Sequence, residues 1–224
     1  MYAKYHIETT QWVLRDDFSP KALRQVISAN LSQDSVLRFL HPNQYRRHFC
    51  NNQISDSIEY VEEQHALIES LAQQSVEQVH LARELARHQR AALGRLLHTV
   101  QDFYSHTNYV DLWLSEQPAR ESALIRTIDG LNEDVLNHNE LRTAHWFMLE
   151  ILFYVPIIGV LLRCLWLPPH SHEAMHLDSP ERGLRFVYSM IMAQQRTTAE
   201  YRRAVHAIAK QGGPKVLENF YKGE

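Results

Sequence analysis

Three side chains that can bind a metal ion lie four residues apart in the stretch LLHTVQDFYSHTNYVDLW, residues 96–113. They are His98, Asp102 and His106. In an α-helix, residues four apart lie one turn above each other, so these side chains would form a stripe along one face. This spacing can bring two side chains to one ion, and zinc accepts imidazole nitrogen and carboxylate oxygen. Two overlapping pairs place the carboxylate between two ions, the usual arrangement for hydrolysing phosphate esters.

The same spacing has a simpler interpretation, which the sequence leaves open. A histidine on an apolar helix face is more often a core residue than a ligand, and a His–Asp pair at this spacing stabilises a helix without metal. Gly94 lies one turn before His98 and weakens a helix by up to about 1 kcal/mol. We therefore expect another segment to approach the helix closely at Gly94.

Further residues of ligand type lie far from this stretch. His6 precedes the first helix that the sequence predicts, Asp34 lies in a connector, and His48–Phe49 follows 14 residues later. The segment PHSHEAMHLDSP, residues 169–180, contains four more: His170, His172, His176 and Asp178. A solvated polar loop would explain this segment, but the density of ligand types between prolines favours metal binding.

The elements that must position these residues are predicted to be helices. The chain has 224 residues with only 7 glycines and 8 prolines, and few alternating β-branched runs. A helix is predicted over residues 17–30, with Ser19 as N-cap and Pro20 at its first position. A looser connector is expected over 31–53, and a long amphipathic helix from about Ser55 to about Gln89.

The second half of the chain is predicted to be helical as well. A more apolar helix is expected over 90–113, and a polar helix over 119–140, broken near Gly130, with Pro118 at its boundary. A final helix is expected from about Pro180 to about Lys210, where QGGPK breaks it. The prediction is an all-α protein with one helical domain over 1–210 and a C-terminal tail over 211–224.

The run ILFYVPIIGVLL, residues 151–162, raises the question of membrane contact. It lies within an apolar insertion of about residues 148–168. A spanning helix needs roughly 20 residues, and runs of about 10 to 14 are more often core or interfacial. A buried helix or loop is the favoured interpretation, and a surface that touches lipid is the alternative.

Composition limits the partners and the compartment. A net charge of −3 gives no basic field for nucleic acid. The two cysteines, Cys50 and Cys164, form neither a ligand motif nor a disulfide framework. The segment MYAKYHIETTQW lacks the features of a secretory peptide, which predicts cytoplasmic synthesis. Membrane association, export by another route and homo-oligomer formation are left open.

The stretch GRLLHTVQDFYSHTNYVDLW resembles the central motif of the Het-C-like proteins. These are distant relatives of zinc-dependent phospholipase C and the zinc-dependent single-strand nucleases, which share an all-helical fold. The order of the other candidates is similar too, so the resemblance extends over about residues 5–205. It implies a site with two or three Zn²⁺ ions. Its metal ligands would be His6, Asp34, His48, His98, Asp102, His106, His172 and either His176 or Asp178.

The resemblance also implies roles. His48, His98 and Asp102 would hold one zinc, while His106, His172 and His176 or Asp178 would hold a second. His6 would assist a third, and Asp34 would ligate a metal or orient the attacking water. Tyr104, Asn108 and Asp111 are candidates for holding the imidazoles in their ligating form.

Three departures separate the chain from this pattern. The enzymes use the amino group of a processed N-terminal Trp as a ligand, whereas this sequence begins at Met1 and its first Trp is Trp12. Their second His lies six residues beyond the helical Asp, whereas His106 lies four beyond and Asn108 occupies the sixth place. The apolar insertion has no obvious counterpart in them.

These inferences predict a zinc-dependent phosphodiester hydrolase of the phospholipase C type, with phospholipid or a membrane surface as its partner. The alternative is a Het-C-like membrane-active effector, in which the metals are structural and residues 151–162 engage lipid. A third option is a helical protein whose metals only stabilise the fold.

Overall fold

The computed structural model describes residues 1–35, 44–116 and 128–223. Within these ranges the fold is a single all-α bundle with two isolated β-bridges and no strand, which confirms the predicted fold class. The α-helices are α1 (Ala3–Leu14), α2 (Pro20–Leu31), α4 (Ile54–Glu77), α5 (Ala82–His106), α6 (Tyr109–Ser115), α8 (Glu133–Leu136), α9 (Ile158–Leu165), α10 (His172–Met175) and α11 (Leu184–Lys222). The 3₁₀ helices are η1 (Ser32–Asp34), η2 (Tyr45–Arg47), η3 (Val79–Leu81), η4 (Met148–Tyr154) and η5 (Pro180–Arg182).

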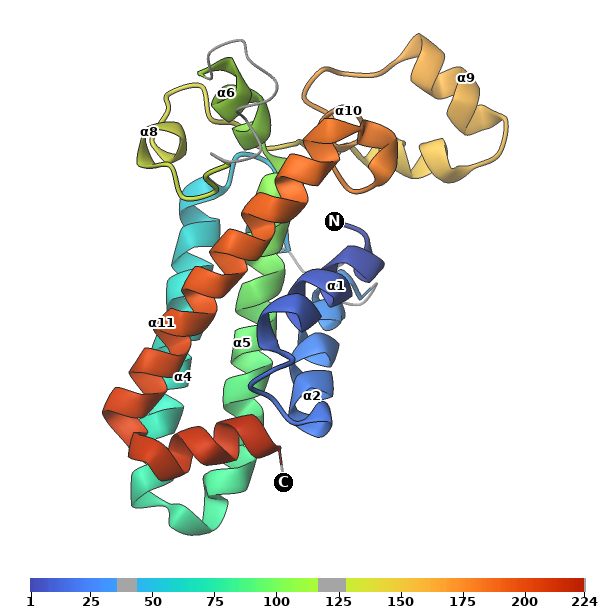
Figure 1. Ribbon diagram of the computed structural model, residues 1–224. Coiled ribbons are helices and arrows are strands. Elements are labelled where there is room, and N and C mark those ends of the chain that lie inside the picture. The colour runs from blue at the N-terminus through green and yellow to red at the C-terminus, as the bar shows by residue number, and fades with distance from the viewer. Residues whose placement is uncertain (36–43, 117–127, 224) are drawn as a thin grey trace.

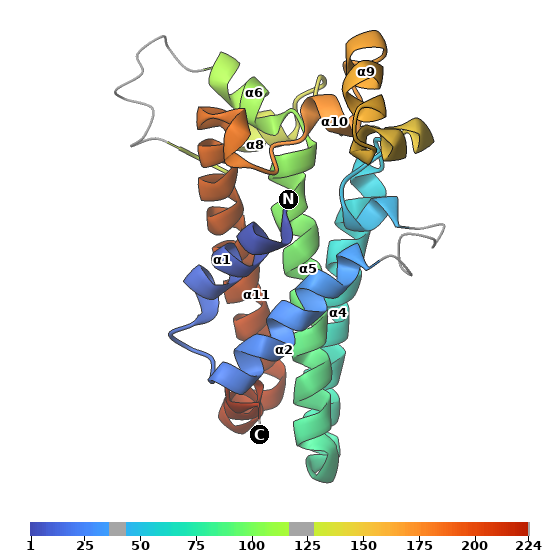
Figure 2. The same cartoon turned by 90° about the vertical axis from the view of Figure 1, so that its right-hand side faces the viewer.

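Helix α5 is the central element of the bundle. Leu93, Leu96 and Leu97 are completely buried, and α2, α4 and α11 all pack against α5. Figure 1 shows α4, α5 and α11 as three long helices side by side, and Figure 2 shows α1 and α2 on the remaining side of α5. Burial of apolar side chains from all of these helices makes α5 the rigid frame of the fold.

Gly94 is the point where α2 crosses α5. A Cβ atom at Gly94 would lie 2.3 Å from the Val26 carbonyl oxygen and 2.8 Å from the Ala29 Cβ. The expected close approach of another segment at Gly94 is therefore confirmed. The same crossing also places the next turn of α2 against α5. There Asn30 is buried beside His98.

Two helix boundaries differ from the prediction. The helix expected over 55–89 is divided, because α4 ends at Glu77 and α5 begins at Ala82. Gln78, with φ −119° and ψ 65°, starts the turn, and no glycine or proline marks it. The predicted helix over 90–113 likewise ends at His106, and α6 follows after an extended Thr107. The apolar periodicity continues through both breaks, so it conceals them.

Helix α1 was not predicted, because its buried face is mostly polar. That face consists of His6, Thr9, Thr10 and Leu14, so the helix has no apolar period to detect. His6 therefore lies inside a helix, not before the first one. By contrast, α2 has the predicted cap: Ser19 Oγ accepts a hydrogen bond from the Ala22 N–H, and Pro20 follows it.

The C-terminal segment belongs to the bundle and does not form a separate tail. The predicted break is present as a kink at Gly213, whose φ is 71°, but α11 continues to Lys222. Val216 and Phe220 lie in the same core cluster as Leu93. Buried Arg90 of α5 donates from Nη1 to the carbonyl oxygens of Asn219 and Phe220, at 2.9 and 3.0 Å.

The remaining predictions concern loops. Residues 36–43 of the expected connector, and residues 117–127 with Pro118, lie outside the described residues. In the described part of the expected polar helix over 119–140, only the short α8 is helical.

The favoured interpretation of the apolar run as buried is wrong. Residues 148–165 form η4 and α9, and most of their aliphatic side chains are exposed. No helix in the described part of the chain is long and apolar enough to cross a membrane.

Candidate metal centre

The last three turns of α5 carry the predicted stripe of His98, Asp102 and His106, and all three are buried. Backbone hydrogen bonds attach two later segments to this end of the helix. The Leu177 N–H donates to the Ser105 carbonyl oxygen at 2.8 Å, and the Ala144 N–H donates to the His106 carbonyl oxygen at 2.7 Å. The first bond fixes the segment that contains His172 and Asp178 beside the helical stripe, and the His172 N–H also donates to the carbonyl oxygen of His145, next to Ala144, at 2.8 Å.

The first group of potential ligands, the Asp34 group, consists of Asp34, His48, His98 and Asp102. One ligand atom of each lies within 4.8 Å of all the others. Asp102 Oδ2 is 2.8 Å from His48 Nδ1 and 3.1 Å from His98 Nε2, and these two nitrogens are 3.1 Å apart. Asp34 Oδ1 lies 3.4 Å from His98 Nε2 and 3.8 Å from His48 Nδ1. Four ligands at about 2.0 Å from a tetrahedral zinc are about 3.3 Å apart, so these four atoms fit such an ion.

The second group, the Asp178 group, consists of His106, His172 and Asp178. His106 Nε2 lies 3.3 Å from both His172 Nε2 and Asp178 Oδ1, and His172 Nε2 lies 3.9 Å from Asp178 Oδ2. Three protein donors leave one position of a tetrahedral ion free, which is the arrangement of hydrolytic zinc sites.

Two nitrogen atoms from the start of the chain lie near the second carboxylate oxygen of Asp102, Oδ1, which does not face the Asp34 group. The Met1 amino nitrogen lies 2.6 Å from Asp102 Oδ1 and 2.9 Å from Asp178 Oδ1. His6 Nε2 lies 3.2 Å from Asp102 Oδ1, without the geometry of a hydrogen bond to any described group. Nitrogen and carboxylate donors therefore converge at a third place, beside the two groups.

Buried acceptors fix the tautomers of the imidazoles. Gln101 Oε1 lies 2.6 Å from His6 Nδ1, and the His48 carbonyl oxygen lies 3.0 Å from His106 Nδ1. An oxygen of this kind only accepts, so each Nδ1 donates and each Nε2 keeps its lone pair for a metal. Asn30 Oδ1 lies 3.4 Å from His98 Nδ1 and favours the same tautomer there.

Burial and charge prepare most of the ligands for metal. Burial lowers the pKa of His98 to about 4 and that of His172 to about 3, so both imidazoles are neutral at pH 7. Burial opposes ionisation of Asp102 and Asp178, but the Met1 ammonium and His106 outweigh it and hold both pKa values well below the usual range. These four ligands thus have the protonation states that divalent ions require.

His106 and the Met1 amino group are the exceptions. Burial lowers the pKa of His106, but the carboxylates of Asp102 and Asp178 outweigh it and raise that pKa well above its usual value. The same two carboxylates overcome burial and raise the pKa of the Met1 amino group to about 11. A metal bound by these nitrogens must displace their protons.

The structure brings together most of the predicted ligands but not all. His176 lies outside both groups: its Nδ1 is 3.5 Å from Asp178 Oδ2, and its ring stacks on that of His172. His170 lines a different cavity. His48 is positioned by its neighbour Phe49, which is buried against Phe103 and has a φ of 47°.

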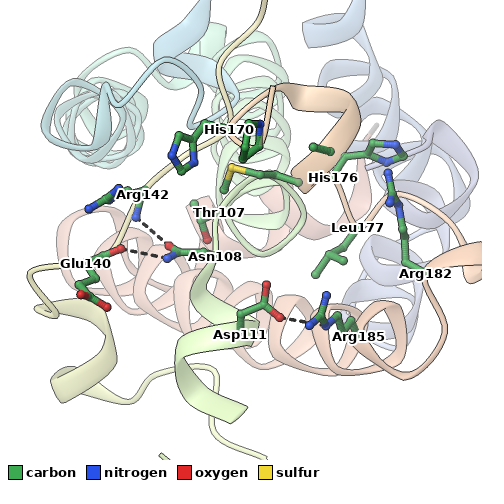
Figure 3. Close-up of a pocket in the computed structure, with 13 residues that line it drawn as sticks. Thr107, Asn108, Asp111, Glu140, Arg142, His170, His176, Leu177, Arg182 and Arg185 are labelled. Carbon is green, nitrogen blue, oxygen red and sulfur yellow. Dashed lines mark hydrogen bonds and ion pairs between the residues drawn. The ribbon is translucent and has the colours of Figure 1, made fainter. Parts of the chain in front are cut away.

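The three residues proposed to hold the imidazoles do not contact them. The Tyr104 hydroxyl donates to the Gly130 carbonyl oxygen. Asn108 and Asp111 line a cavity of about 460 Å³ beyond the metal groups, where Asp111 pairs with Arg185 (Figure 3). Asn30 and Gln101 have this role instead. The signal for Gln101 was a neutral polar side chain next to Asp102, in the stretch between Val100 and Phe103.

A small cavity lies over both groups and gives them access to solvent. It has a volume of about 130 Å³ and is lined by Asp34, His48, His106 and His172, with Trp146 and Cys50 among the other lining residues. The Asp34 side chain is 44% exposed there. Trp146 and Cys50 were not predicted as site residues, because neither lies in a spacing pattern with the histidines.

Fold and site together define an all-helical protein with two His/Asp groups that could hold metal ions at one end of its bundle. The chain belongs to the VWA7 N-terminal domain family, whose model matches residues 9–133. The matched region contains the complete Asp34 group and His106, but not His172 or Asp178. Comparisons with curated proteins and with solved structures found no match. The Het-C-like resemblance thus stays a prediction from the sequence.

Proposed function

We propose that the protein is a zinc-dependent phosphodiester hydrolase of the phospholipase C type. The observation that carries this proposal is the pair of donor groups at the end of α5, the Asp34 group and the Asp178 group, with the access cavity above them. Zinc at such sites lowers the pKa of bound water to about 7 and stabilises charge on phosphoryl oxygens. Two nearby divalent ions are the usual solution for phosphate ester hydrolysis.

The residues of the two groups have distinct roles in this proposal. His48, His98 and Asp102 hold one ion, and His106, His172 and Asp178 hold the other. Asp34 completes the first group from the exposed side, where its second carboxylate oxygen can accept a proton from the attacking water. Gln101 and Asn30 keep the imidazoles oriented.

Phospholipid is the substrate class that we propose. Trp146 gives the access cavity an apolar wall, and exposed aliphatic side chains follow it directly in sequence. A net charge of −3 offers little attraction to a nucleic acid backbone. Hydrolysis would release the phosphorylated headgroup and leave diacylglycerol.

The test combines metal analysis with a lipid assay. We expect about two zinc ions per chain and release of phosphocholine from phosphatidylcholine. In His98→Ala we expect loss of the zinc ion of the Asp34 group and loss of activity. His88→Ala is the matched control, because His88 lies on the same helix, is exposed and contacts only Glu84 among the described residues. Full activity in a metal-free preparation, or in His98→Ala, would refute the proposal.

The exposure of residues 151–162 supports the effector as a second candidate function. An effector with structural metals would release dye from vesicles without releasing headgroups. Asp34→Asn separates the two candidates, because Asp34 lies at the exposed edge of its group. The hydrolase loses headgroup release in this variant, whereas the effector keeps its dye release.

A further inference from the structure

Residues 147–167, which we call the projection, extend outward from the bundle end that carries the metal groups. Figures 1 and 2 show η4 and α9 standing away from the long helices. The projection begins directly after Trp146, which lines the access cavity, and is followed at His172 by a residue of the Asp178 group. It is thus continuous in sequence with the candidate site at both ends.

The projection has a small interior of its own. Phe153 is buried against the Trp166 ring, with the Arg163 guanidinium 5.2 Å from its ring centre. A Cβ at Gly159 would lie 2.1 Å from the Phe153 carbonyl oxygen, so α9 packs directly on η4. This interior is complete without the outward-facing side chains.

The outer surface of the projection is almost entirely aliphatic. Its exposed large apolar residues are Leu149, Ile151, Leu152, Val155, Ile157, Ile158, Val160, Leu161, Leu165 and Leu167. Its two charged residues, Glu150 and Arg163, both have polar partners. Glu150 is 2% exposed and accepts from the Phe147 and Glu173 N–H groups, and Arg163 pairs with Glu173 at 2.8 Å.

The tip of the projection is strained in a way that exposes an isoleucine. The Ile158 N–H donates to the Pro156 carbonyl oxygen at 2.8 Å, which closes a three-residue turn with φ 69° and ψ −56° at Ile157. This turn is rare and costly for a β-branched residue. The Ile157 side chain is nevertheless 76% exposed, so no packing within the described fold accounts for it.

The arrangement of these side chains fits a bilayer better than a protein partner. Exposed aliphatic residues lie on both η4 and α9, on an element that stands away from the bundle (Figure 1), whereas a protein partner normally covers one face. Aromatic rings lie at its base, where Phe147 packs against Trp166 at 5.5 Å. Aliphatic tips with aromatic bases are typical of segments that enter the membrane interface. Helix α9, with 8 residues, is too short to cross it.

We propose that the projection inserts into the interface of a phospholipid bilayer and orients the access cavity toward the lipid headgroups. The exposed aliphatic surface, the turn at Ile157 and the aromatic base support insertion without reference to any activity. The delivery of headgroups to the cavity rests on the proposed function. With the projection inserted, the protein would act on lipid packed in a bilayer in preference to dispersed lipid.

Co-sedimentation with phosphatidylcholine vesicles in excess EDTA tests insertion without metal or turnover. We expect the chain to sediment with vesicles, and Ile157→Asp combined with Leu165→Asp to weaken this partition at least tenfold. The matched control is Val76→Asp with Val79→Asp, which changes two exposed residues at the far α4–α5 turn. Unchanged circular dichroism shows that each variant is folded.

The outcomes separate insertion from the proposed function. Equal sedimentation of the projection variant and the wild type, or no sedimentation of either, overturns insertion. If sedimentation velocity shows a dimer of the wild type that the projection variant does not form, the aliphatic surface binds a second copy of the chain. That result also overturns insertion. If the wild type binds vesicles but releases no headgroup with zinc present, insertion stands and the hydrolase proposal fails. With a soluble phosphocholine ester, the projection variant should keep its activity within about twofold.

Discussion

Replacing Asp102 with asparagine should weaken zinc binding in the Asp34 group with little change in the shape of the site. One carboxylate oxygen faces His48 and His98 at 2.8 and 3.1 Å, and the other faces the Met1 amino nitrogen at 2.6 Å. An amide keeps the size but loses the charge, and it must turn an N–H donor toward one of these two sides. In either orientation a ligand or a partner of the buried ammonium is lost.

The size of the effect follows from the number of donors. Structural zinc sites bind with about 10–16 kcal/mol in small peptides, which is about 2.5–4 kcal/mol for each of four donors. Since about 1.4 kcal/mol corresponds to tenfold, zinc affinity in the Asp34 group should fall by about 10²–10³-fold. The Asp178 group should be weakened less, because it keeps its three donors.

Competition with a chromophoric zinc chelator measures this affinity directly. Asp111→Asn is the matched control, since it removes the same charge near the same end of the molecule from a residue that pairs with Arg185 outside the metal groups. We expect its affinity to equal that of the wild type. If Asp102→Asn binds zinc as tightly as the control, Asp102 is not a ligand and the arrangement proposed here is wrong.

Three further predictions concern stability. Gly94→Ala should lower the free energy of unfolding by about 1–3 kcal/mol in urea titration, since the new methyl would press on the α2 backbone; an increase would contradict the close crossing. Glu200 pairs with His65 at 2.7 Å; burial opposes its ionisation, but that bond and neighbouring arginines lower its pKa below 4.5. Its stabilisation is therefore present above pH 4.5 and lost as the pH falls through the folded-state value, and Glu200→Gln should flatten this part of the stability profile. Arg90→Met should increase hydrogen exchange in residues 214–222, at a cost of about 3–6 kcal/mol for two lost charged hydrogen bonds of about 1.5–3 kcal/mol each; unchanged exchange would show that the arginine does not anchor this segment.

The sequence was most informative where one local rule decided the structure. Ser19 followed by Pro20 set the start of α2, and the four-residue spacing from His98 set the stripe on α5. The α4–α5 turn was not predictable in this way. It forms at Gln78 without glycine or proline, and the tertiary packing of two antiparallel helices fixes it.

The metal groups, too, could be predicted from the sequence only in part. Spacing could identify the α5 stripe, and the density of ligand types in residues 169–180 indicated His172 and Asp178, whereas Asp34 and His48 were assigned by resemblance and order. No local rule could place Asn30 beside His98, because that contact depends on the crossing of α2 over α5. The exposure of the projection could not be predicted from the sequence either, since an apolar run has the same composition whether it faces a core or a membrane.

The position of both groups on one helix end has a consequence for how the ions would be loaded. His98, Asp102 and His106 lie at single-turn intervals on one rigid helix, and the other ligands come from segments that pack against its end. The first ion to bind would bear the entropic cost of ordering these segments against the helix, and the second would find them already ordered. We therefore expect titration to show cooperative uptake, with reciprocal coupling between the two positions.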